Sequence, residues 1–101
     1  ETEMGSGMAS YYGRELAGNR TASGEAFDPD DLTCAHRTLP FGSKIRVTNL
    51  ANGKSVVVRV NDRGPWGRGR VIDISHAAAK EIGMHRSGTA RVSMTLVDDG
   101  D

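Results

Sequence analysis

The sequence predicts a small all-β protein, a closed barrel of about six short strands with one short helix. With 101 residues, including 13 glycines and three prolines, the chain has room for one domain and many turns. Its apolar residues fall in short alternating runs separated by turn signals, which is typical of strands. Strands this short favour a barrel, because closure removes exposed edges.

The strands are predicted from their alternation and from the turns between them. Residues 44–49 and 55–60 both alternate, and Asn52-Gly53 between them is a strong hairpin signal. One helix is predicted over residues 76–82, because Ser75 can cap its start and Gly83 can end it. The other strands are predicted at residues 8–13, 33–36, 70–74 and 90–97.

The barrel domain is expected to span residues 7–97. Residues 1–6 are interpreted as a linker, and residues 98–101 as a solvated tail. The inward faces of the alternating strands predict a buried core that contains Val47, Val56, Val58, Val60, Ile72, Val92 and Met94.

Charge and cysteine content restrict the classes of partner. Thirteen basic and thirteen acidic residues cancel, which argues against binding to nucleic acid or to a membrane surface by net charge. A neutral polymer such as a glycan is compatible with this balance. The single cysteine, Cys34, excludes an internal disulfide. No apolar run approaches the roughly 18 residues that a membrane span needs.

The most informative segment ends the strand at residues 55–60. The alternating valines lead directly into Asn61-Asp62-Arg63, and Gly64-Pro65 then breaks the strand. This pattern places the Asp62 carboxylate at the mouth of a β-structure. The alternative is a polar turn, in which Asp62 caps backbone N–H groups or pairs with Arg63.

Three further ionisable residues lie at or near the ends of predicted elements. Glu25 follows a flexible loop, His36 closes a strand, and Asp73 is flanked by Ile72 and Ile74, so its side chain should point away from theirs. Cleavage of a glycosidic bond requires paired carboxylates, one of them protonated. The alternatives are a solvated Glu25 and an Asp73 that caps the helix.

The sequence favours neither a metal site nor thiol catalysis. The three histidines have no ligand spacing, and Cys34 has no partner cysteine. Cys34 and His36 would share a strand face, but a residue spacing of two leaves their hydrogen bonding uncertain. Cys34 is better explained as a small buried apolar residue.

Several ordered segments resemble the rare lipoprotein A family, and the resemblance runs from about Gly7 to Leu96. It is carried by Gly7-Met8-Ala9-Ser10-Tyr11-Tyr12-Gly13, Thr21-Ala22-Ser23-Gly24-Glu25-Ala26-Phe27, Ala35-His36-Arg37-Thr38-Leu39-Pro40-Phe41-Gly42, Val47-Thr48-Asn49, Asn52-Gly53-Lys54, Asn61-Asp62-Arg63-Gly64-Pro65 and Asp73-Ile74-Ser75. One departure is Cys34, where the family usually has a small residue, often alanine.

The resemblance implies a six-stranded double-psi β-barrel similar to the expansin N-terminal domain. It also implies a bacterial envelope protein with lytic transglycosylase activity on peptidoglycan. The family's functional residues correspond to Glu25, His36 and Asp62, and Asp73 corresponds to an aspartate that expansin-like relatives need.

The expected reaction cuts the linkage between N-acetylmuramic acid and N-acetylglucosamine and leaves an anhydro-muramic end. Asp62 is the expected acid and base, Glu25 would orient the sugar or support an oxocarbenium-like state, and His36 would bind sugar or tune Asp62. An acid must hold a proton, so Arg63 is expected to turn away from Asp62. The alternative function is a non-catalytic peptidoglycan-binding or wall-loosening, expansin-like module.

Substrate contacts are expected from residues around this site, with Asp73 at the floor of one groove shared by Glu25, His36 and Asp62. The expected contact residues are Ser10, Tyr12, Arg63, Trp66 and Asp73, although aromatic rings here could equally pack in the core. No cofactor and no metal are expected. The expected protein is a monomer of the periplasm or envelope, with an outer-membrane lipid anchor in a longer protein. It would bind glycan strands and septal envelope proteins, and no nucleic acid.

Overall fold

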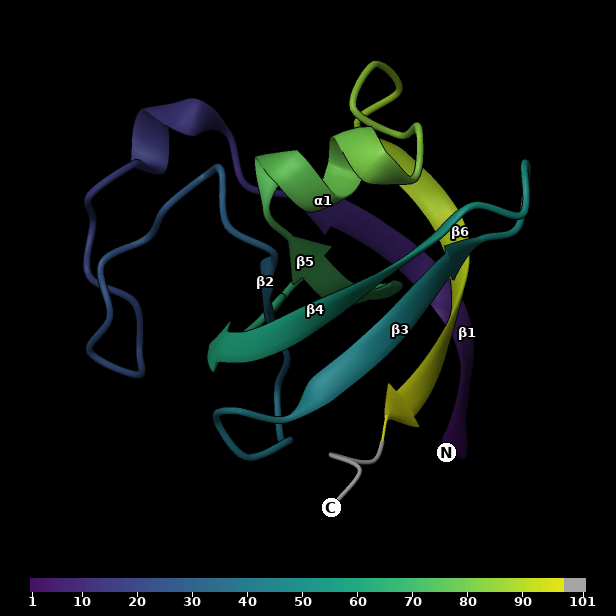
Figure 1. The fold of residues 1–101 in the computed structure, drawn as a ribbon, viewed down its shortest axis with the longest axis horizontal. Helices are drawn as coiled ribbons and strands as arrows, with labels where there is room; N and C mark the ends of the chain where they lie inside the picture. Colours follow the sequence, from purple (N-terminus) through teal and green to yellow (C-terminus); the bar gives the residue numbers. More distant parts are fainter. Residues whose placement is uncertain (98–101) are drawn as a thin grey trace.

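The computed structural model describes residues 1–97, which form a closed six-stranded barrel with the strand order β1-β5-β2-β4-β3-β6 (Figure 1). The closed barrel predicted from the sequence is therefore confirmed. Its elements are β1 (Thr2–Tyr11), a 3-10 turn η1 (Arg14–Leu16), β2 (Thr33–Ala35), β3 (Lys44–Asn49), β4 (Ser55–Asp62), β5 (Arg70–Ile74), α1 (His76–Glu81) and β6 (Thr89–Val97).

The β3–β4 hairpin forms because its two strands alternate in phase. Val47 pairs with Val56 and Ile45 with Val58, and all four side chains are buried. Gly53 has φ +76°, the left-handed conformation that a tight hairpin turn needs. The valines, isoleucines and methionines of these strands meet inside the barrel. All seven predicted core residues are buried.

The short strand β2 lies between β4 and β5 and determines which side chains meet at one end of the barrel. It runs parallel to β4 and antiparallel to β5. Ala35, its last residue, is in register with both Asp62 and Asp73. Cys34 is completely buried and lies in register with Val60 and Ile74. Closing the barrel therefore brings two aspartates that are distant in sequence to either side of one strand.

The N-terminal segment differs from the expected linker. β1 begins at Thr2 and pairs with β6 from the Thr2–Leu96 pair to the Ser10–Thr89 pair. The register shifts between Glu3 and Gly5, which allows the strand to bend as it joins the barrel. Residues 2–6 thus belong to the barrel. The predicted tail at residues 98–101 lies outside the described residues.

The helix α1 has the predicted cap and stop. Ser75 Oγ accepts a hydrogen bond from Ala78 N at 3.3 Å, and Gly83 has φ +72° just after the helix. Asp73 is not the cap. In Figure 1 the helix lies across one end of the barrel. Within residues 1–97, no helix has the length and apolar character needed to span a membrane.

Candidate active site

Asp62, the last residue of β4, has a carboxylate that is held by three hydrogen-bond donors. Its Oδ1 accepts from Ala22 N at 2.9 Å and from Arg63 N at 2.8 Å. Its Oδ2 accepts from the Tyr12 hydroxyl at 2.8 Å. These donors come from the loop that contains Ala22, from the residue after β4 and from the residue directly after β1, so the carboxylate orientation depends on the assembled barrel.

Tyr12 is placed by both backbone and ring contacts. Its N–H donates to Ile74 O at 2.9 Å, and its ring meets Phe27 edge-on with centroids 5.1 Å apart. Burial, and next the hydrogen bond to Asp62, raise the pKa of the Tyr12 hydroxyl far above its usual value. Tyr12 therefore stays protonated and remains a donor to Asp62.

A cavity of about 200 Å³ opens beside this pair. Asp62, Tyr12 and Phe27 form part of its wall, and the rest is formed by Leu16, Asn19, Arg20 and Thr21. Glu25, His36 and Asp73 do not line it. The expected single groove, with Asp73 at its floor, is therefore not found: Asp62 lines this cavity, His36 lines a separate one, and Glu25 and Asp73 line neither.

The loop that carries Glu25 is fastened to the end of β4. Ser23 N donates to Asn61 O at 3.2 Å, and Thr21 N donates to Glu25 O at 2.8 Å. Together with the Ala22–Asp62 bond, these contacts bring Glu25 and Asp62 to the same end of β4.

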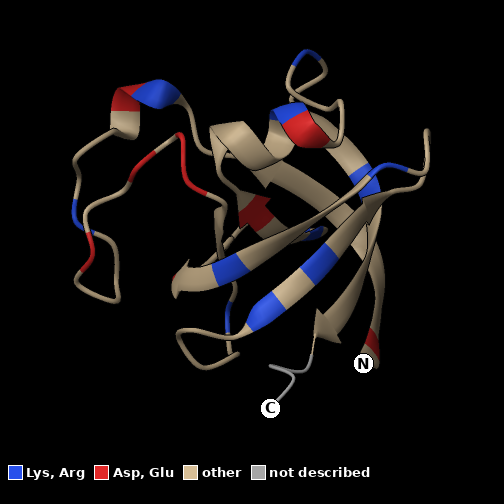
Figure 2. Ribbon diagram, in the orientation of Figure 1, with Lys and Arg blue, Asp and Glu red and all other residues tan. Residues whose placement is uncertain are grey.

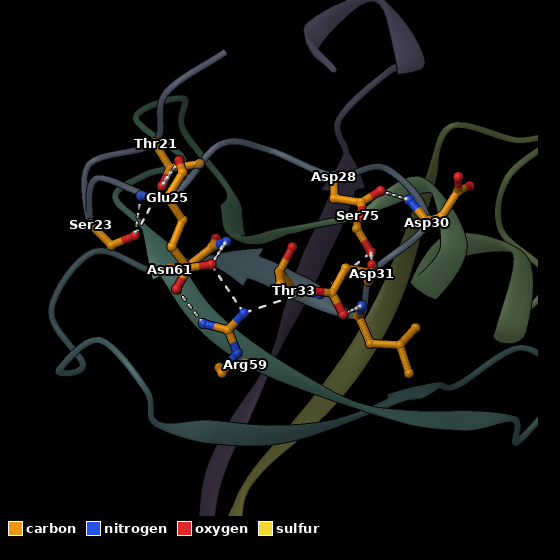
Figure 3. Close-up of polar contacts among 11 residues, drawn as sticks. Thr21, Ser23, Glu25, Asp28, Asp30, Asp31, Thr33, Arg59, Asn61 and Ser75 are labelled. Atoms are coloured by element: carbon orange, nitrogen blue, oxygen red, sulfur yellow. Dashed lines mark hydrogen bonds and ion pairs between the residues drawn. The ribbon is translucent and has the colours of Figure 1, made fainter. Parts of the chain in front are cut away.

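The Glu25 carboxylate is occupied by β4 side chains (Figure 3). Arg59 donates to both of its oxygens, at 2.5 and 3.0 Å, and Asn61 Nδ2 donates at 3.2 Å. The Arg59 and Asn61 hydrogen bonds lower the pKa of Glu25 below its usual range, so Glu25 is ionised at neutral pH. Arg59 also lies 3.7 Å from Asp31, which links β4 to the loop before β2.

In Figure 2 basic positions lie along β3 and β4, and several acidic positions lie in the loop before β2. That loop also contains Arg20. An ionised Glu25 that is already paired is poorly suited to hand over a proton. It is better suited to holding a fixed negative charge.

His36 lies next to Asp62 through the backbone, since His36 N donates to Asp62 O at 3.1 Å. Its Nδ1 accepts from Thr38 N at 3.3 Å and Leu39 N at 3.2 Å, which makes Nε2 the protonated nitrogen of the neutral ring. Burial lowers the pKa of His36, and the charges of Arg63 and Arg37 lower it further. The ring lines a second cavity of about 280 Å³, with Arg37 and Thr38.

The Arg63 guanidinium is directed away from the Asp62 carboxylate, as predicted. It donates to His36 O at 3.1 Å and lies 4.0 Å above the centre of the Phe41 ring. Only its backbone N–H reaches Asp62. The side chain therefore contacts the loop after β2 and does not pair with the Asp62 carboxylate.

Asp73 points away from the buried Ile72 and Ile74, as its strand position predicted. It accepts a hydrogen bond from the Ser10 hydroxyl, and Arg70 Nη1 lies 3.6 Å from it. Arg70 also donates to Ser10 Oγ at 2.8 Å. Ser10, Arg70 and Asp73 form a compact polar group across β1 and β5.

The aromatic residues around this end of the barrel have different environments. Tyr11 donates to His85 O at 2.6 Å and packs beside His76, so it supports α1 rather than the site. Trp66 is 74% exposed and follows the Asp62 turn.

Within residues 1–97, no group of three histidine, cysteine, aspartate or glutamate side chains is arranged to hold a metal ion.

Some residues of the site carry little sequence signal. Ala22 contributes only a backbone N–H, and its role depends on where the loop lies. In the sequence, Arg59 is an ordinary outward-facing residue of an alternating strand, although its side chain pairs with the Glu25 carboxylate. Asn61 was visible as part of the polar strand end, but its bond to Glu25 was not.

Comparison with known proteins identifies the family. The family described as lytic transglycolase matches residues 4–94, which is most of the chain. The chain belongs to the lytic transglycolase family. Its fold is the six-stranded double-psi β-barrel that the sequence led us to expect.

Curated relatives of this lytic transglycolase domain carry the RlpA name, which confirms the resemblance to the rare lipoprotein A family. A Synechocystis protein named probable endolytic peptidoglycan transglycosylase RlpA is 58% identical over 91 residues, covering 90% of this chain and 28% of that protein. Pseudomonas aeruginosa RlpA, named endolytic peptidoglycan transglycosylase, is 56% identical over 92 residues, covering 91% and 27%. The chain thus spans little more than a quarter of the length of these two relatives.

Solved structures support the fold of this family member. The apo Clavibacter michiganensis expansin has a TM-score of 0.76 at 22% identity, covering 96% of this chain and 52% of that one. The Streptomyces papain inhibitor has a TM-score of 0.74 at 23% identity, covering 96% of both chains. At these identities the likeness concerns the barrel alone.

Proposed function

We propose that this domain is a lytic transglycosylase that cleaves the N-acetylmuramic acid to N-acetylglucosamine linkage of peptidoglycan. The observation that carries the proposal is the Asp62 carboxylate, which is fixed by three donors at the wall of a cavity. The printed names of the RlpA relatives support the same substrate.

The hydrogen bonds favour one oxygen of Asp62 as the atom that exchanges the proton. Oδ1 already accepts two backbone N–H bonds, which occupies both of its acceptor positions. Oδ2 accepts one bond, from Tyr12, and keeps one position free. Oδ2 is therefore the oxygen on which a transferable proton can reside.

The reaction then needs one acid and base and no water nucleophile. Protonated Oδ2 gives its proton to the glycosidic oxygen as the bond from that oxygen to C1 of the muramic acid breaks. The muramic acid's own C6 hydroxyl attacks C1 and closes the anhydro ring. Its proton passes to the Asp62 carboxylate, which restores the acid.

Glu25 and His36 would support this step rather than exchange the proton. The ionised Glu25 would favour positive charge developing on the sugar ring. The neutral His36 would offer Nε2–H to a sugar hydroxyl, because Nδ1 is already engaged by two backbone donors. Ser10, Arg63 and Asp73 are proposed as polar contacts at the edges of the site.

We also propose the setting of this activity. A domain that acts on peptidoglycan belongs in the periplasm or envelope. In this proposal the domain acts there as a monomer. A lipid anchor lies elsewhere in a longer protein, and septal envelope proteins are its partners.

The test is digestion of purified peptidoglycan, with products analysed by mass spectrometry. We expect anhydro-muramic ends from the wild type and none from Asp62→Asn. In this variant Asn Oδ1 can still accept from Ala22 and Arg63, and the Tyr12 hydroxyl can turn to accept from the new amide, so unfolding free energy should change by no more than about 1 kcal/mol.

Asp30→Asn is the matched control, because within residues 1–97 the exposed Asp30 carboxylate pairs only with Arg14, and its backbone N–H, which donates to Asp28 Oδ1, is kept in the variant. It should retain full activity. Reducing ends from the wild type would indicate a hydrolase instead. Binding to peptidoglycan without any soluble product would favour the wall-loosening or binding module, and a fully active Asp62→Asn would refute the role given to Asp62.

A further inference from the structure

The segment between β4 and β5 has few ties of its own to the barrel. Within the described chain, residues 64–68 make no backbone–backbone hydrogen bond to the rest of the barrel, and Gly69 O accepts only a long 3.4 Å bond from Met8 N. This segment nevertheless carries Trp66, which is 74% exposed.

The side chain of Arg37, from the loop after β2, holds this segment. Arg37, directly after His36, donates from Nε to Pro65 O at 2.5 Å. Its Nη2 donates to Gly67 O at 3.0 Å and to Arg70 O at 3.1 Å. The carbonyls of Pro65 and Gly67 lie on either side of Trp66 in the chain, so the guanidinium is hydrogen-bonded to the backbone before and after the exposed indole.

The chemistry of arginine suits this task. A planar guanidinium presents several N–H groups in a fixed fork, so it can span three carbonyl oxygens at once, whereas a lysine ammonium acts as a point charge. The indole also lies close to the Gly64 backbone, since a Cβ added at Gly64 would be 3.6 Å from Trp66 Nε1.

We propose that Arg37 is a positioning residue for substrate binding, which holds the 64–69 segment so that Trp66 forms a rigid platform for a pyranose ring. Pyranose rings present C–H faces that pack on aromatic rings, and a platform fixed before binding loses less conformational entropy when the sugar arrives. This inference rests on the proposed function for the glycan class, and it adds a role for a residue that does not itself touch the substrate.

The chain contains one tryptophan, so its fluorescence reports on this segment alone. We expect Arg37→Gln to lower the steady-state anisotropy of Trp66, because the segment gains motion. Arg37→Lys should behave nearly as Arg37→Gln, since charge without the fork cannot hold three carbonyls. Arg86→Gln is the control: Arg86 is an exposed arginine in the loop after α1, with no hydrogen bond or ion pair within residues 1–97, and it should leave anisotropy unchanged.

Binding is measured by sedimentation with insoluble peptidoglycan sacculi. Arg37→Gln and Trp66→Ala should each raise the apparent Kd about three- to tenfold, and the double variant should be no weaker than Trp66→Ala alone. In a cleavage assay the Arg37 effect should appear in KM, with kcat within about twofold of wild type.

Several results would overturn the proposal. Unchanged anisotropy in Arg37→Gln would show that Arg37 does not order the segment. Weaker binding of the double variant than of Trp66→Ala would show that Arg37 contacts glycan directly, and wild-type binding by Trp66→Ala, or no binding by the wild type, would remove the platform. Absence of anhydro products from the wild type refutes the proposed catalysis instead, because anisotropy and sedimentation do not require cleavage.

Discussion

Replacing Tyr12 with phenylalanine isolates the contribution of one hydrogen bond to the Asp62 carboxylate. The substitution removes the hydroxyl that lies 2.8 Å from Oδ2 and keeps the ring against Phe27. A hydrogen bond contributes about 0.5–1.5 kcal/mol between neutral groups and about 1.5–3 kcal/mol when one partner is ionised, and Asp62 takes both forms in the proposed cycle. Asp62 and Tyr12 line a cavity of about 200 Å³, where water can replace the lost donor, so the net loss should be about 1–2 kcal/mol.

The same free energy sets the expected effect on the reaction. If Tyr12 holds Oδ2 in the orientation that the transition state needs, a loss of about 1–2 kcal/mol lowers kcat by about 5- to 30-fold. The assay is the initial rate of formation of anhydro-muramic ends, together with urea unfolding of the same variant.

Tyr11→Phe is the matched control for this experiment. Tyr11 also loses a hydroxyl bond, to His85 O at 2.6 Å, but it lies under α1 and makes no contact with Asp62. It should lower stability with little change in rate. A rate for Tyr12→Phe within twofold of wild type would refute the orienting role, and a loss as complete as that of Asp62→Asn would move the proton transfer to Tyr12 itself.

Two further predictions concern stability. Val58→Ala should lower the unfolding free energy by about 1–3 kcal/mol, because Val58 is 1% exposed and pairs with Ile45; a change near zero in urea unfolding would contradict its core position. His36→Asn should flatten the loss of stability as pH falls below about 6.5, the usual histidine pKa, measured by urea unfolding at a series of pH values. The folded-state pKa of His36 is lowered by burial, so the unfolded chain takes up the proton first on acidification, whereas Asn Oδ1 keeps the acceptor for Thr38 and Leu39 without titrating; an unaltered pH profile would contradict this reasoning.

The parts of the fold that the sequence predicted are those determined by local pattern. The β3–β4 hairpin follows from alternation and from Asn52-Gly53, and the helix follows from Ser75 and Gly83. The start of β1 was misplaced, because Gly5 and the polar residues around it resemble a linker. Their pairing with β6 is a contact between the two ends of the chain, which no local pattern encodes.

The site residues also divide into those with a local sequence signal and those without one. Asp62 was found because a strand end followed by Gly-Pro is a local signal. Its Ala22 partner could not be found, since a backbone N–H has no side-chain signature and depends on how the loop packs. Arg59 could not be distinguished from a solvated strand residue until the loop brought Glu25 to it. Arg37 likewise carried no signal beyond its place after His36.

The complete burial of Cys34 has a consequence for redox chemistry. Burial raises the pKa of its thiol far above the usual value, so almost no thiolate, the reactive form, exists in the folded protein. In an oxidising compartment the thiol is shielded from disulfide exchange between molecules and from sulfenic acid formation. Only a molecule in which β2 separates from β4 or β5 exposes it, so the rate at which a thiol reagent modifies this single sulfur measures how often the barrel opens at the strand beside Asp62.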